Sequence, residues 1–147
     1  MCLVIDKITK IRKPRTGFII RKKASNGVLT PVYNDNILCR GKIGDTITDP
    51  NWIADSYPFE VGQGIEIGCL HVFKNKREAI KAMHSCYFYE DNVIVEVSIT
   101  PGLLLIGYTL RFNSELDPLP CYGCKSYLLE KIVRTFEYQK GKKNAKS

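Results

Sequence analysis

The chain has 147 residues, of which 44% are hydrophobic and 25% charged, and its formal net charge is +7 at pH 7. This is the composition of an ordinary globular domain, and no run of about 18 apolar residues occurs, which excludes a helical membrane protein. Asp6 and Lys7 interrupt the apolar start of the chain, so no secretory signal is expected. The expected location is the cytoplasm, where the six cysteines would remain thiols.

Positive charge is concentrated at the two ends of the chain. Residues 1–23 contain eight Lys and Arg against one acidic residue, and residues 139–147 contain four Lys. Because the whole chain carries +7, the residues between these ends carry a net charge of −4. A duplex-binding protein usually spreads basic charge over one folded face. The pattern instead indicates basic extremities that attract an anionic partner.

The N-terminal half is expected to contain a basic arm, a β-hairpin and a long loop. The arm is expected over about residues 1–16, because basic and apolar residues alternate there without a clear period and Lys13-Pro14-Arg15 cannot continue a helix. Asn26-Gly27 predicts a hairpin turn, since both residues tolerate positive φ. The expected elements after the arm are strands over 17–21, 28–33, 37–40 and 43–47 and a loop over 49–64.

The clearest local signals of the C-terminal half surround a helix. Asn75 is a good N-cap and Glu78 follows three residues later, a capping-box arrangement that predicts a helix over about 76–84. The β-branched residues of 93–99 predict a buried strand, and Pro101-Gly102 predicts the turn after it. The other expected elements are strands over 65–73, 103–108 and 126–138, a break at 117–120 and a Lys-rich disordered tail over 139–147.

These elements predict one α+β domain over residues 1–138. Its expected architecture is a curved, mostly antiparallel sheet of six or seven strands with one short helix packed on it. The residues expected to form the core are Phe18, Ile20, Val28, Ile65, Ile67, Val72, Ile80, Met83, Val93, Val95, Val97, Ile99, Leu104, Ile106, Leu128 and Ile132.

Basic residues near the N-terminus are interleaved with apolar and aromatic ones, a pattern typical of phosphate contacts. Two aromatic residues of the long loop and a histidine, which faces a cleft if its strand neighbours face the core, would complete such a site. The residues expected to bind an anionic ligand are Lys13, Arg15, Arg21, Lys22, Lys23, Trp52, Tyr57 and His71. The alternative is a solvated basic arm that aids solubility, with the aromatic side chains packed onto the body.

Cys121-x-x-Cys124 is the most motif-like pair in the chain. Two thiolates at this spacing can hold one Zn²⁺ ion, and tetrahedral coordination needs two further ligands. Cys69 and His71, which alternate on one expected strand, are the candidates for these positions. The alternative is that these cysteines are ordinary buried thiols. A redox role is disfavoured, because the neighbouring Pro and Gly indicate a turn where a thiol-exchange motif opens a helix.

Four segments in order resemble a group of small proteins. They are residues 1–3 (MCL), 68–73 (GCLHVF), 93–102 and 122–128. Together they resemble small, largely uncharacterised phage and bacterial proteins that begin Met-Cys-Leu and carry a Gly-x-x-His-x-Phe step from strand to helix. The resemblance covers most of residues 1–133. It implies a phage setting, in which a small basic protein acts on host machinery or host defences in the host cytoplasm.

The same step from strand to helix is also similar to part of the nicotinamide-binding cleft of ADP-ribosyltransferases. In that family an early His or Arg, a Tyr or His on this strand, and a later Glu act together. The likeness implies that Arg21 stands at the early position, His71 at the strand position and Glu96 at the position of the acid, with NAD as substrate.

Three functional hypotheses follow, of which the first is the main one. The first is a non-enzymatic, phage-type accessory protein that needs no cofactor or membrane and binds an anionic host ligand. That ligand is a nucleotide-like molecule, a nucleic acid or an acidic protein surface, and the role is counter-defence. The second hypothesis is an ADP-ribosyltransferase-like enzyme that uses NAD. The third is a small interaction domain stabilised by zinc.

Overall fold

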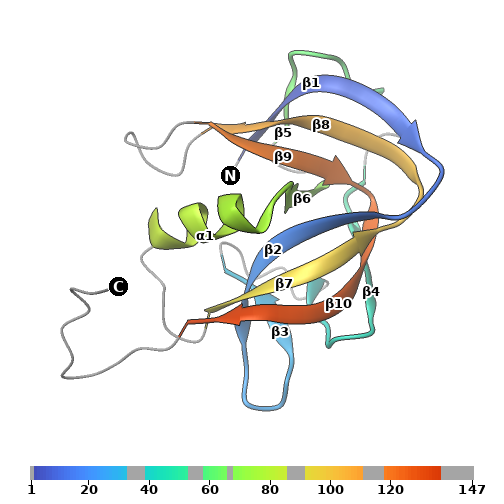
Figure 1. Cartoon of the computed structure of the whole chain (residues 1–147). Coiled ribbons are helices and arrows are strands. Elements are labelled where there is room, and N and C mark those ends of the chain that lie inside the picture. Colours follow the sequence, from blue (N-terminus) through green and yellow to red (C-terminus); the bar gives the residue numbers. More distant parts are fainter. Residues whose placement is uncertain are drawn as a thin grey trace.

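In the computed structural model, the part of the chain that the structure describes forms one curled antiparallel sheet and one short helix (Figure 1). The structure describes residues 2–32, 39–52, 58–65, 68–85, 92–110 and 118–136. Within this part of the chain, no helix combines the length and the hydrophobicity needed to cross a membrane. The expected tail, Tyr57 and residues 37 and 38 of the expected strand over 37–40 lie outside the described residues, and Cys39 and Arg40 do not belong to a strand.

The sheet has ten strands among the described residues, in the order β4-β10-β7-β2-β6-β9-β8-β1-β5, with β3 paired to β2. The strand pairings are antiparallel. A curved antiparallel sheet with one short helix is confirmed, whereas six or seven strands is too few. The elements are β1 (Cys2–Ile11), β2 (Arg15–Lys23), β3 (Leu29–Pro31), β4 (Thr46–Thr48), β5 (Gly64–Ile65), β6 (Leu70–Phe73), α1 (Lys76–Ser85), β7 (Asn92–Ile99), β8 (Gly102–Leu110), β9 (Leu119–Cys124) and β10 (Ser126–Thr135).

Three strands are additional to those predicted: β1, β5 as a strand of its own, and β9. β3 and β4 correspond to the expected strands over 28–33 and 43–47, but each has only three residues. The expected strand over 65–73 is divided, since β5 pairs with β1 while β6 pairs with β2 and β9. Gly68 lies between the two strands with φ of 119°, a left-handed conformation that favours glycine. The expected break at 117–120 leads directly into β9, which begins at Leu119.

Residues 2–11, which the sequence places in a basic arm, form strand β1. This strand pairs with β8 along its whole length. Ile5 and Lys7 lie opposite adjacent residues of β8, so Asp6 between them is the extra residue of a β-bulge. One extra residue reverses the face to which the following side chains point. The bulge therefore explains why this part of the sequence shows no regular alternation.

The main core lies on one face of the sheet, which we call the inner face. It joins buried side chains of β4, at one end of the strand order, with those of β8, near the other end. Strands so far apart in a sheet share one cluster only if the sheet curls around it. The buried residues of this cluster are Ile19, Leu29, Cys39, Ile47, Leu70, Val72, Val93, Val95, Val97, Ile99, Leu104, Tyr122, Cys124, Tyr127 and Leu129.

The opposite, outer face carries the helix. The backbone N–H groups of Glu78 and Ala79 donate to the carbonyl oxygen of Asn75 at 3.1 and 3.2 Å, so α1 begins after Asn75, as predicted. The helix packs on β2, β6 and β7. Ala79, Ala82 and Met83 share a cluster there with strand residues that include Ile20, Phe73 and Ile94. A second outer cluster, which contains Leu3, Ile5, Phe59 and Ile65, covers the β1 end of the sheet.

The predicted hairpin and most of the predicted core are confirmed. β2 pairs with β3 around a turn in which Gly27 has φ of 86°. Nine predicted core residues are buried: Ile20, Ile65, Val72, Met83, Val93, Val95, Val97, Ile99 and Leu104. The others are half-buried, except Ile67, which lies outside the described residues. In β10 it is Tyr127 and Leu129 that are buried instead of Leu128, because they point to the inner face.

Candidate anion-binding site

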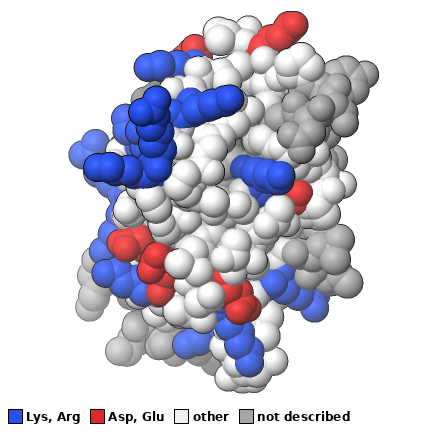
Figure 2. All heavy atoms as spheres, turned by 90° about the vertical axis from the view of Figure 1, so that its right-hand side faces the viewer, with Lys and Arg blue, Asp and Glu red and all other residues white. Residues whose placement is uncertain are grey.

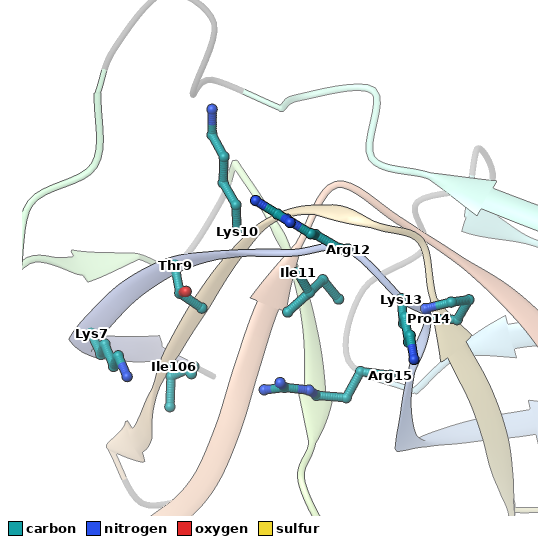
Figure 3. Close-up of a pocket in the computed structure, with 9 residues that line it drawn as sticks. All are labelled: Lys7, Thr9, Lys10, Ile11, Arg12, Lys13, Pro14, Arg15 and Ile106. Carbon is teal, nitrogen blue, oxygen red and sulfur yellow. The ribbon is translucent and has the colours of Figure 1, made fainter.

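An open hollow of about 440 Å³ lies where β1 turns into β2 (Figure 3). Five of the nine residues that line it are Lys or Arg, and none of the nine is acidic. The lining residues are Lys7, Thr9, Lys10, Ile11, Arg12, Lys13, Pro14, Arg15 and Ile106. This site, called the basic hollow below, therefore has a positively charged lining.

The β-bulge in β1 determines the floor of the basic hollow. Ile11 packs against the inner-face core, and because side chains alternate along a strand, Lys7 and Thr9 share its face. Lys7 pairs with Ile106 of β8, which in turn pairs with Tyr122 of β9. A cationic, an aliphatic and an aromatic side chain thus lie in one row across three neighbouring strands.

Arg15 completes the basic hollow from β2. Its guanidinium carbon lies 5.7 Å from the centroid of the Tyr122 ring, within the range of a cation–π interaction. In Figure 3, the side chains of Lys7 and Arg15 extend toward Ile106 from opposite sides. The two cations therefore flank an apolar floor that Ile11 and Ile106 provide.

The other three cations form the rim of the basic hollow. Lys10 points away from the floor in Figure 3, and Arg12 and Lys13 belong to the turn between β1 and β2. Figure 2 views the molecule from the side on which this turn lies, and it shows Lys and Arg gathered in the upper left of that face. All five cationic side chains are exposed. None of them forms an ion pair with a carboxylate of the described residues.

Three of the basic residues predicted to bind the ligand lie elsewhere. The Arg21 guanidinium donates to the Tyr127 hydroxyl at 2.5 Å and to the carbonyl oxygen of Ile20 at 2.8 Å. Lys22 and Lys23 lie at the far end of β2, roughly 25 Å along the strand from Arg15. The structure thus brings Lys13 and Arg15 together in the basic hollow and separates them from Arg21, Lys22 and Lys23.

The predicted cleft near Trp52 and His71 is not part of the basic hollow. Trp52 packs edge-on against Phe59 in the outer cluster, with 5.5 Å between the ring centroids. His71 pairs with Gly123 on the outer face, and its Nε2 lies 3.0 Å from the carbonyl oxygen of Ile65. Burial lowers the pKa of His71 below its usual value, so the neutral ring donates this hydrogen bond. Both residues therefore have packing roles on the face opposite to the floor.

The three residues implied by the likeness to ADP-ribosyltransferases do not converge. Arg21 points to the inner face, where it contacts Tyr127. Glu96 alternates with the buried inner-face residues of β7 and so points outward, where its carboxylate lies 4.0 Å from the ammonium of Lys131. His71 is also on the outer face, against Ile65. The sheet itself separates Arg21 from the other two residues.

The four residues considered as zinc ligands are also divided between the faces. Cys121 belongs to the outer cluster with Cys69, whereas Cys124 belongs to the inner-face core. Residues three apart in a strand point in opposite directions, and the expected turn at this pair is in fact strand β9. Burial raises the pKa of Cys121 to about 12 and that of Cys124 further still. Among the described residues, no three metal-ligating side chains form a group that could hold an ion.

No protein-family model, no curated protein and no solved structure matches the chain in comparisons with known proteins. Ammonium and guanidinium groups are suited to phosphate and carboxylate oxygens. The nine lining residues include no imidazole, thiol or carboxylate, so they offer charge and shape but no general base.

Sequence reasoning identified Lys13 and Arg15 but missed the floor of the basic hollow. Lys7 was grouped with the basic arm, and Ile106 was assigned to the core. The missed signal is the interrupted alternation of β1 at Asp6, which marks a β-bulge and turns Lys7 toward the inner face.

Proposed function

We propose that the protein is a non-enzymatic binding protein that captures a phosphate-bearing anion in the basic hollow. The single observation that carries this proposal is the set of five exposed cations around one hollow with no acidic lining residue. A charged surface that only aids solubility usually mixes both signs. The basic hollow instead holds like charges together, and a bound anion would relieve their repulsion.

The closeness of the five cations in one hollow favours a ligand with several negative charges. At physiological ionic strength, screening acts over about 8 Å, so neighbouring cations of the same hollow add to one local potential. Phosphate groups accept several hydrogen bonds each and match the planar donors of arginine. A ligand with more than one phosphate can contact the floor cations and the rim cations together.

The proposed setting follows the resemblance to small phage and bacterial proteins. Under this proposal the ligand belongs to the host cell, and its capture interferes with host machinery or host defence. The fold contributes a rigid sheet that holds the cations in place, and no cofactor is needed for capture.

The experiment that tests this proposal compares two double variants of equal charge change. Lys10→Glu/Lys13→Glu reverses two rim cations of the basic hollow, and Lys22→Glu/Lys23→Glu reverses two exposed cations at the far end of β2. Binding of inorganic tripolyphosphate is measured by isothermal titration calorimetry at fixed ionic strength. We expect the first variant to lose at least about tenfold in affinity and the second to change by less than about threefold.

Equal losses in the two variants would show that only the total charge matters and would contradict the proposal. Absence of binding by the unaltered protein would contradict it as well. Circular dichroism spectra of both variants provide the folding control, and the exposure of all four side chains favours retention of the fold.

A further inference from the structure

The arrangement of the basic hollow also indicates what carries the phosphates. Resting on the proposed function, we infer that the ligand is a single strand of nucleic acid. Its phosphates follow the cations of β1 and the turn, and one base lies against the apolar floor beside Arg15.

The cations form a line and not a broad face. All five come from β1, the turn after it and the first residue of β2. From Lys7 to Arg12 the strand spans roughly 16 Å, a length that suits a few nucleotides of one strand. In Figure 2, basic side chains gather in one area of the face, while acidic and basic side chains are mixed in the lower part. A duplex presents two phosphate backbones, and the second would meet this mixed surface.

The floor of the basic hollow offers an apolar surface that a simple phosphate ligand would not contact. Ile11, Pro14 and Ile106 give the basic hollow an apolar part between its cations. Its volume of about 440 Å³ lies within the usual range of ligand pockets, roughly 300–1,000 Å³. A nucleobase has an apolar face that can cover these side chains, whereas an inorganic polyphosphate or an aspartate-rich or glutamate-rich peptide offers mainly charge.

Arg15 is the residue on which a base can stack. Its guanidinium plane has the Tyr122 ring near it, 5.7 Å from the centroid. The Arg15 side chain is exposed, so its second side is open toward the solvent. Arginine planes and aromatic rings both serve as stacking platforms for bases of single strands. Tyr122 is itself buried and therefore orients Arg15 without contacting the ligand directly.

The substitution Arg15→Lys separates stacking from charge. Lysine keeps the positive charge but lacks the planar group, so the contact with phosphates remains and the stacking surface is lost. We expect this variant to bind a fluorescently labelled oligothymidylate about tenfold more weakly, since stacking on one platform has effects of that order. We expect its affinity for tripolyphosphate to fall much less than its affinity for the oligothymidylate, because the positive charge is kept and tripolyphosphate has no base to stack.

Salt dependence gives a second, independent measurement. For the unaltered protein, the slope of log affinity against log salt should be no steeper than about −3.5, because each neutralised phosphate of a single strand contributes about 0.7 and five cations are available. Lys10→Glu/Lys13→Glu should make the slope shallower by about 1.4. Arg15→Lys should leave the slope unchanged while it lowers the affinity.

The outcomes distinguish this inference from the proposed function. The inference would be overturned if the protein bound single-stranded and duplex DNA with equal affinity and Arg15→Lys had no effect. If the protein still bound tripolyphosphate in that case, the proposed function would remain intact. Tighter binding of polyglutamate than of the oligothymidylate would also overturn it and would indicate an acidic protein ligand. Absence of binding to all of these probes would contradict both. Preference for the single strand, lost in Arg15→Lys, supports the inference.

Discussion

At the residue scale, Tyr127 illustrates how one buried group limits the pH range of the fold. Its side chain is fully buried in the inner-face core, and its hydroxyl oxygen accepts a hydrogen bond from Arg21. Burial raises the pKa of Tyr127 to about 12, against the opposing effect of Arg21. An unfolded tyrosine ionises at about pH 10, so the unfolded state loses this proton first as the pH rises. The stability that the protonated phenol contributes is complete below about pH 10 and is lost between about pH 10 and 12.

We expect Tyr127→Phe to make the alkaline loss of stability less steep. Phenylalanine does not ionise, so one source of the decline in the free energy of unfolding between about pH 10 and 12 is removed. At neutral pH the same change should cost about 1 kcal/mol, because the hydrogen bond with Arg21 is lost. Urea unfolding at a series of pH values measures both effects. An unchanged alkaline slope would show that the Tyr127 phenol does not limit stability.

At the scale of elements, the pair of β1 and β8 determines whether the basic hollow can form. Gly107 of β8 lies at the β-bulge, where a Cβ atom would come within 1.9 Å of the carbonyl oxygen of Val4. A real side chain cannot occupy that position, so glycine allows the two strands to approach each other. The close approach holds Lys7 beside Ile106 in the floor of the hollow.

We expect Gly107→Ala to destabilise the protein by at least about 2 kcal/mol, because the backbone of β1 must move to admit the methyl group. Affinity for tripolyphosphate should fall as well, since β1 carries Lys7 and Lys10 and leads into the turn with Arg12 and Lys13. Gly62→Ala is the comparison variant: Gly62 has φ of 90° and nothing within 4 Å of an added Cβ, so its cost should be about 1 kcal/mol from backbone strain alone. If thermal unfolding shows equal costs for the two variants, the close approach at Gly107 is not a constraint.

The elements that sequence reasoning predicted are those with local signals. The cap at Asn75 and the turn at Asn26-Gly27 predicted α1 and the hairpin, because backbone hydrogen bonds and allowed φ angles depend on a few adjacent residues. β5 and β9 were missed, because such short or proline-containing strands exist only through pairing with distant partners. The division of the expected strand over 65–73 into β5 and β6 also depends on distant residues, since each half pairs with a different strand.

The site was predicted in part for the same reason. Lys13 and Arg15 are conspicuous in the sequence, and both line the basic hollow. Their partners Lys7 and Ile106 come from the register of β1 on β8, which a β-bulge shifts by one residue. Arg21 was predicted to bind the ligand together with Lys13 and Arg15, but alternation along β2 directs it into the inner face, to Tyr127. The sequence shows that basic residues form the site, and the fold determines which of the basic residues line it.

At the scale of the whole molecule, the structure shows where the positive charge of the N-terminal segment lies. The sequence places eight cations in residues 1–23, and the structure assigns five of them to one hollow at the turn between β1 and β2. The basic segment is thus a structural part of the sheet, and an anion bound there would contact a preformed site. Preformed sites avoid the ordering cost that a flexible arm has on binding.

The most direct test of this account is an NMR titration of the ¹⁵N-labelled protein with oligothymidylate, because it reports where the ligand binds. We expect the backbone amides of residues 7–13, of Arg15 and of Ile106 to shift progressively, while those of residues 22–29 on the hairpin stay unchanged. Shifts centred on the hairpin or on the outer face near His71, or none at all, would contradict the assignment of the basic hollow as the anion-binding site.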